Sequence, residues 1–193
     1  MATGQKLIEC CALDRYLRQV LIQWHKLKTN KKGDIMKTCL FVGVDTHKYS
    51  HTAAVLDGYF EVVATISFDN STEGFNHLFD KLKKLISGRD LVFGLEDSQG
   101  LGSFLACYLT GKGHLALEIN PVSTDRGRKH TVSRDKSDKK DAIVIAKTLI
   151  RERANLHPVR INRNSVAMRG IGIPPYACKR VYKDKKQASC GSI

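Results

Sequence analysis

The order of the patterns along the chain predicts an α/β fold built on a mixed sheet. Three short apolar runs come first, and from about residue 71 onward segments of helical spacing alternate with further apolar runs. Strands joined by a tight turn pair antiparallel, whereas strands joined through a helix pair in parallel. We therefore expect an initial antiparallel hairpin, followed by parallel strands with helices flanking the sheet.

Each expected strand is a run rich in β-branched or aromatic residues. The strands are expected at residues 37–45, 51–56, 60–68, 91–96 and 114–119. Asp57-Gly58 lies between the second and third runs and is a strong hairpin signal.

The expected helices follow from apolar residues at helical spacing. One begins after Ser71 and is stopped by Gly88, one spans about 99–111, and one runs from Asp138 to about Arg153. The polar segment 122–137 is expected to be a loop or a short helix.

Composition limits the class of protein. The chain has 193 residues, 42% of them hydrophobic and 26% charged, as in an ordinary globular domain. No apolar run approaches the roughly 20 residues of a membrane span, and the charged N-terminus does not resemble a signal peptide. We therefore expect a cytoplasmic protein with no membrane partner. The 32 Lys and Arg residues exceed the 19 Asp and Glu residues and give a net charge of +13, which favours a polyanionic partner.

Three regions are expected along the chain. Residues 1–35 form a leader or amphipathic extension, because Lys32 to Met36 can be encoded by a bacterial ribosome-binding site and a start codon. Residues 36–160 form the domain. Residues 161–193 show little periodicity and end abruptly, as in a truncated or frame-shifted tail.

Acidic residues occur where the expected elements end or begin. Asp45 and Glu96 each end a strand, and Asp138 and Asp141 lie one helical turn apart beside an apolar stripe. Each acid alone could be a turn residue or a helix cap. Together they would need cations if they were buried against the sheet, and carboxylate oxygens suit Mg²⁺ or Mn²⁺. The pattern thus indicates a divalent-metal site.

Four motifs occur in order around these acids. They are Gly-Val-Asp-Thr-His-Lys at 43–48, Gly-Leu-Glu-Asp-Ser at 94–98, Asn120-Pro121, and Lys-Ser-Asp-Lys-Lys-Asp-Ala at 136–142. Over about residues 36–160 the chain resembles the DEDD transposases of the bridge-RNA-guided insertion-sequence family. This resemblance implies an RNase H-like (RuvC-like) fold. It also implies that the catalytic and metal-binding residues of a two-metal site with Mg²⁺ or Mn²⁺ are Asp45, Glu96, Asp138 and Asp141.

The resemblance also implies what the protein would bind. The expected partners are DNA and a structured guide RNA, and the protein could also form a homo-oligomer. The expected location is the bacterial cytoplasm, in association with the nucleoid. Full-length members continue into a C-terminal domain that supplies a serine nucleophile, and no serine here lies in a matching motif. We therefore expect this chain to be a fragment.

Basic residues near the expected acids are candidates for holding phosphates beside the metal site. These nucleic-acid-binding candidates are Lys48, Arg126, Arg128, Lys129, Arg134, Lys136 and Lys139. Asp97 is expected to point away from the site. His47 belongs to the first motif, and the sequence does not decide between packing, substrate positioning and chemistry for it.

Other functions fit parts of the pattern. A stand-alone RuvC-like junction nuclease would use the same acids without a second domain, and a non-catalytic nucleic-acid-binding remnant would explain the abrupt C-terminus. A phosphotransferase of the actin and sugar-kinase type would need a Gly-rich phosphate loop, and the sequence shows none.

Overall fold

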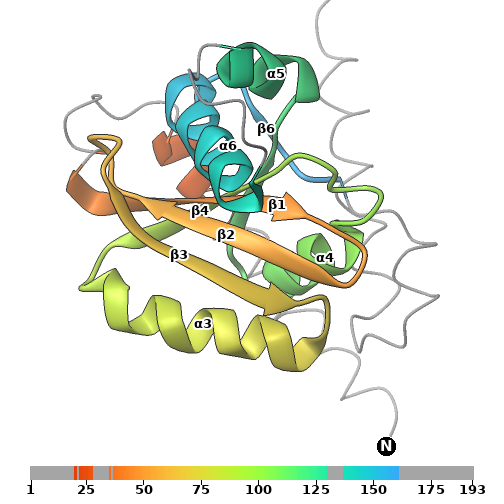
Figure 1. Cartoon of the computed structure of the whole chain (residues 1–193). Helices are drawn as coiled ribbons and strands as arrows, with labels where there is room; N and C mark the ends of the chain where they lie inside the picture. The colour runs from red at the N-terminus through yellow and green to blue at the C-terminus, as the bar shows by residue number, and fades with distance from the viewer. Residues whose placement is uncertain (1–19, 21, 28–34, 36, 130–136, 161–193) are drawn as a thin grey trace, which may run out of the picture.

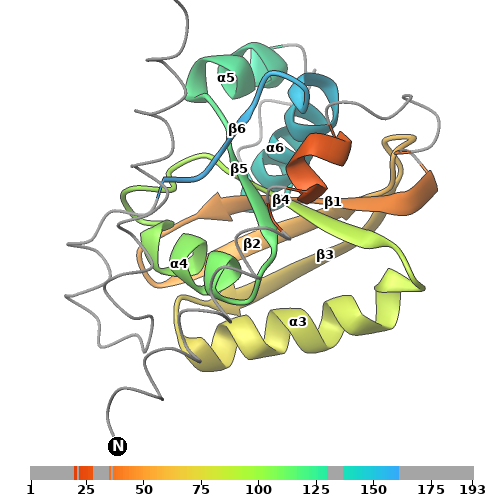
Figure 2. The same cartoon turned by 180° about the vertical axis from the view of Figure 1, so that it is seen from behind.

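The computed structural model describes residues 20, 22–27, 35, 37–129 and 137–160. Within them lies a six-stranded sheet in the order β3-β2-β1-β4-β5-β6 (Figures 1 and 2). The strands are β1 (Cys39–Thr46), β2 (Ser50–Leu56), β3 (Val62–Asp69), β4 (Asp90–Leu95), β5 (Leu115–Glu118) and β6 (His157–Pro158). The helices are α3 (Thr72–Ile86), α4 (Ser103–Gly111), α5 (Pro121–Lys129) and α6 (Asp138–Glu152).

The sheet is mixed, as expected. β1, β2 and β3 form an antiparallel meander, β4 and β5 are added in parallel on the other side of β1, and β6 closes the sheet antiparallel to β5. The two parallel strands are each reached through a helix, which is the connection that parallel pairing requires. This arrangement of strands and helices is an RNase H-like α/β fold.

The side chains of β1 alternate between the two faces of the sheet. Leu40, Val42 and Val44 are buried in one core cluster with residues of α3 and α4. Phe41 is buried in a second cluster, with residues of α6. Figures 1 and 2 accordingly show α3 and α4 on one side of the sheet and α6 on the other. Asp45, at the end of the odd-numbered set, therefore belongs to the face that α6 covers.

One glycine of the sheet forms the seat of α6. Gly43 of β1 pairs with Gly94 of β4 in the parallel register. A Cβ atom on Gly43 would lie 2.6 Å from the carbonyl oxygen of Ala142 and closer still to the backbone nitrogen of Ala146. Because only a hydrogen fits in this space, the α6 backbone rests directly on β1.

The first helix is bounded as its sequence predicts. Ser71 is the N-cap of α3, and its hydroxyl accepts a hydrogen bond from the Gly74 amide at 3.1 Å. Ser87 and Gly88 follow the helix with positive φ angles of 42° and 79°. The left-handed backbone that ends the helix therefore includes the expected glycine.

Other elements differ from the expected bounds for local reasons. α4 begins at Ser103 rather than near residue 99, because the Asp97 carboxylate accepts the amide hydrogens of Gly100 and Leu101 at 2.9 and 2.8 Å and holds 97–102 in a turn. The expected loop or short helix after residue 121 is α5, which begins at Pro121. Asn120 Oδ1 accepts from the Val122 amide at 2.9 Å in the manner of a helix cap.

Part of the segment before residue 36 packs on the domain. Val20, Leu27 and Ile35 are buried in the cluster that contains α6, and Trp24 Nε1 donates to the Leu156 carbonyl at 3.3 Å. The domain boundary at Met36 remains a prediction, and most of 1–35 and all of the expected tail 161–193 lie outside the described residues. In the described part of the chain, no helix has the length and apolar character needed to traverse a bilayer.

Candidate metal centre

The first acid lies near the end of a central strand. Asp45 is the penultimate residue of β1, and its side chain is only 13% exposed. It is flanked on one side by β2, where it pairs with Thr52, and on the other by β4. A carboxylate in this position has lost most of its water and depends on neighbouring groups for stabilisation.

The second acid lies directly after the end of the neighbouring strand, level with the first. Leu95, the last residue of β4, pairs with Val44 in the parallel register, and Glu96 follows it directly. Thr124 of α5 is fully buried, and its hydroxyl oxygen lies 2.8 Å from two acceptors, Glu96 Oε1 and the Pro121 carbonyl oxygen, which share its one proton. Glu96 is therefore in contact with a helix that follows it in sequence by more than twenty residues.

The third and fourth acids lie in the first turn of α6. Ser137 is the N-cap of this helix, and its carbonyl accepts from the backbone amide of Asp141 at 3.0 Å. The side chain of Asp138 is 60% exposed, whereas Asp141 is half-buried. The helix N-terminus favours both negative charges through its dipole.

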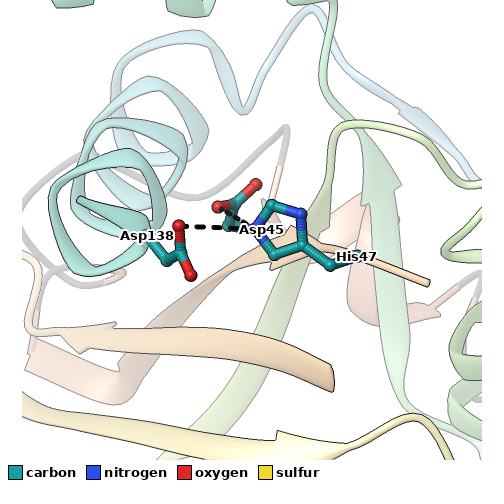
Figure 3. A group of neighbouring side chains, drawn as sticks. All are labelled: Asp45, His47 and Asp138. Atoms are coloured by element: carbon teal, nitrogen blue, oxygen red, sulfur yellow. Dashed lines mark ion pairs between the residues drawn. The ribbon is translucent and has the colours of Figure 1, made fainter. Parts of the chain in front are cut away.

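A histidine connects the strand to the helix. His47 Nε2 lies 3.1 Å from Asp45 Oδ2 and 3.6 Å from Asp138 Oδ1 (Figure 3). Potential ligand atoms of these three residues all lie within 4.8 Å of one another. Glu96 and Asp141 do not belong to this close group.

The other three acids are nevertheless close enough to Asp45 for their negative charges to affect its pKa. The pKa of the Asp45 carboxyl lies above its ordinary value of 3.8. Burial is the largest cause, and the nearby His47 works in the opposite direction. The remaining causes all raise the pKa and are the negative charges of three acids: Asp141, Asp138 and Glu96.

These residues fit a divalent cation. They offer hard carboxylate oxygens, which Mg²⁺ and Mn²⁺ prefer, on a partly open face of the molecule. They also repel one another at Asp45, and a bound cation would relieve this repulsion. Both the donor set and the electrostatics therefore favour metal binding at the ends of β1 and β4.

The basic candidates fall into three groups. Lys48 and Lys139 have exposed side chains and directly follow His47 and Asp138, two residues of the close group. The backbone of α5 carries Arg126, Arg128 and Lys129, but nothing is described of their side chains. Two further candidates, Arg134 and Lys136, lie outside the described residues.

Comparison with known proteins assigns the chain to a family. A model of DEDD transposases of the IS110 type, described as "Transposase", matches residues 42–169, which is more than half of the chain. The chain belongs to this transposase family. The matched segment begins within β1 and extends past α6, and thus includes all four acids.

A relative of this transposase family agrees with the match. A protein of the IS117 mini-circle of Streptomyces coelicolor, named as a transposase, is 32% identical over 124 residues. These residues are 63% of this chain and 28% of the relative. The chain thus spans little more than a quarter of the relative's length.

Sequence reasoning missed two neighbours of the acids in this transposase domain. The sequence assigned no role to His47. Its place two residues after Asp45 was nevertheless a usable signal, because β1 ends at Thr46 and the next residue turns back over the site. Thr124 carried no signal at all, since its role depends on how α5 folds against Glu96. Asp97 was expected to point away from the site, and its carboxylate accepts hydrogen bonds from the Gly100 and Leu101 amides in the turn that precedes α4.

Removing the charge of Asp45 should stabilise the metal-free protein. The raised pKa means that the folded state holds a proton at Asp45 more readily than the unfolded chain does, so stability falls as the pH rises from 3.8 through the raised value. In chelator at neutral pH, Asp45→Asn should therefore unfold at a higher temperature than the wild type. Thermal unfolding followed by circular dichroism measures the shift, which should shrink towards low pH. A variant that is less stable in chelator at neutral pH would contradict the argument.

Proposed function

We propose that this domain carries out divalent-metal chemistry on DNA phosphodiesters during transposition, with Asp45, Glu96, Asp138 and Asp141 as its metal ligands. The observation that carries the proposal is the convergence of these acids on one face, where three of them raise the pKa of the fourth. Membership of the transposase family supports the substrate class.

Each acid would have a position suited to its task. Asp45 and Glu96 lie on adjacent strand ends, while Asp138 and Asp141 approach from the helix that covers them. Bound Mg²⁺ or Mn²⁺ would polarise the phosphodiester and stabilise the attacking and leaving oxygens. The protein's own part is to hold these carboxylates in place, as the contact with Thr124 does for Glu96.

The proposed partners are DNA and a structured guide RNA in the bacterial cytoplasm, near the nucleoid. The net charge of +13 supports a polyanionic partner. Exposed Lys48 and Lys139 are placed to hold backbone phosphates beside the acids. By the family pattern, a serine from a further domain would complete strand exchange, so the acids would supply the metal-binding part of the reaction.

Metal binding tests the site. Calorimetric titration with Mn²⁺ should show binding that Asp45→Ala and Asp138→Ala each weaken by roughly tenfold or more, because each change removes a ligand oxygen from a site with few alternatives. Asp80→Ala is the matched control, since Asp80 is an exposed acid on α3 that pairs with Lys83. Equal Mn²⁺ affinity in the wild type and both site variants would refute the proposed metal centre.

Salt dependence tests the nucleic-acid partner. The logarithm of the DNA association constant should fall linearly with the logarithm of salt concentration, because each phosphate contact releases counterions. Lys48→Ala and Lys139→Ala should each reduce the magnitude of this slope by about 1, whereas Lys84→Ala, on α3, should leave it unchanged. Fluorescence anisotropy with labelled duplex measures the slope. Salt-independent binding, or the same loss in all three variants, would speak against phosphate contacts at the site.

A further inference from the structure

The turn between β1 and β2 is held rigidly by hydrogen bonds from outside it. The backbone amide of His47 donates to His51 Nδ1 at 3.2 Å. Asn70, at the junction of β3 and α3, donates its side-chain amide to the Lys48 carbonyl at 3.1 Å and its backbone amide to the Tyr49 carbonyl at 2.8 Å. Three consecutive residues of the turn are therefore fixed by β2 and by the end of β3.

The anchor of His47 is itself immobilised. His51 is fully buried and lies with its ring centroid 5.4 Å from that of Phe68 and 6.1 Å from that of Phe75, which belongs to α3. A histidine packed in this way loses little further freedom when it accepts a hydrogen bond. The position of the His47 backbone is therefore set by the hydrophobic core rather than by the solvent-exposed turn.

From this fixed turn the imidazole of His47 extends back over the acids. Figure 3 shows its ring beside Asp45 and Asp138, with Nε2 directed towards both carboxylates. The ring is 46% exposed, so its placement here is not a consequence of burial. Among the described residues, these three form the group of potential metal ligands in which all ligand atoms approach within 4.8 Å.

We propose that His47 Nε2 is a direct ligand of the ion held between Asp45 and Asp138, and that it makes this position selective for Mn²⁺ over Mg²⁺. The proposal rests on the proposed function, since it assumes that the acids bind a metal. Imidazole nitrogen suits transition metals, whereas Mg²⁺ strongly prefers oxygen ligands and retains its waters. One nitrogen among several oxygens therefore discriminates between two ions that an all-carboxylate site would bind more equally.

Pre-organisation strengthens this discrimination. A flexible histidine would have to be ordered on metal binding, and that ordering would offset part of the energy gained from the new bond. Here the hydrogen bond from His47 to His51 and the two bonds from Asn70 order the turn beforehand. His51 is thus a positioning residue for the proposed ligand, because it acts through the His47 backbone.

Paired titrations of the full chain test the proposal. Calorimetry with Mn²⁺ and with Mg²⁺ is carried out on the wild type, His47→Ala and His47→Gln, where glutamine keeps a polar side chain but offers no imidazole. We expect both variants to lose roughly tenfold or more in Mn²⁺ affinity and less than about threefold in Mg²⁺ affinity. The control is His77→Ala, because His77 is exposed on α3, and it should bind both ions like the wild type.

A second readout is independent of affinity. In the wild type, addition of Zn²⁺ should shift the nuclear magnetic resonance signal of the His47 Nε2 nitrogen strongly, as direct coordination does, and should leave that of His77 in place.

If His47 only neutralises the carboxylates of the metal-free protein, its removal will leave Mn²⁺ binding unchanged or tighter, and this result would overturn the proposal. Binding that is lost in Asp45→Ala but unchanged in His47→Ala would refute the histidine ligand alone, whereas no Mn²⁺ binding to the wild type would refute the metal centre as well.

Discussion

The contact between Gly43 and the backbone of α6 is the constraint on which the proposed site depends. Asp138 and Asp141 lie in the first turn of α6, and Ala142, directly over Gly43, begins the next turn of the same helix. The depth at which the helix rests on β1 therefore sets how closely its N-terminal acids approach the end of that strand. A larger residue at position 43 would lift the helix, because the atoms it meets are backbone atoms that cannot turn aside.

The same seat concentrates negative charge, which works against folding in the absence of metal. Burial and three like charges raise the pKa of Asp45, so the fold must be stabilised elsewhere. That stabilisation comes from two apolar clusters, one on each face of the sheet, with Phe41 and Ile145 fully buried on the α6 side and Phe75 and Phe93 on the other. The residues that stabilise the fold and the residues of the candidate site thus occupy different parts of one domain. Apolar side chains in the middle of the strands and on the buried faces of the helices stabilise the structure, whereas the strand ends and the first turn of α6 carry the charges.

Much of this could be predicted from sequence, because it depends on local patterns. Alternating apolar runs, Asp57-Gly58 and the Ser71 cap correctly indicated the meander and the first helix, and the parallel strands followed from the helices between them. The two-residue β6 was missed, because a bridge containing Pro158 has no periodicity to detect. The segment that contains α5 was predicted as a loop or a short helix, and the two could not be separated because a polar, basic helix lacks an apolar stripe. At the site, the positions of the acids could be inferred from strand ends and helical spacing. For His47, the sequence offered one signal, its place two residues after Asp45. For the hydroxyl of Thr124 it offered none, because the contact with Glu96 joins elements that are distant in sequence.

Mn²⁺ affinity in paired glycine variants tests most directly whether the seat of α6 creates the metal site. Gly43→Ala should weaken Mn²⁺ binding by roughly tenfold or more and lower the unfolding free energy by about 1–3 kcal/mol, because the helix must move away from β1. Gly94→Ala is the matched control on the neighbouring strand, where the atoms nearest to an added Cβ are side-chain atoms of Ile119 and Leu149, at 3.2 Å, which can move aside more easily than backbone. This variant should keep its Mn²⁺ affinity within about threefold of the wild type. If a folded Gly43→Ala protein, verified by near-ultraviolet circular dichroism, binds Mn²⁺ as tightly as the wild type, the helix seat does not determine the site and the account is wrong.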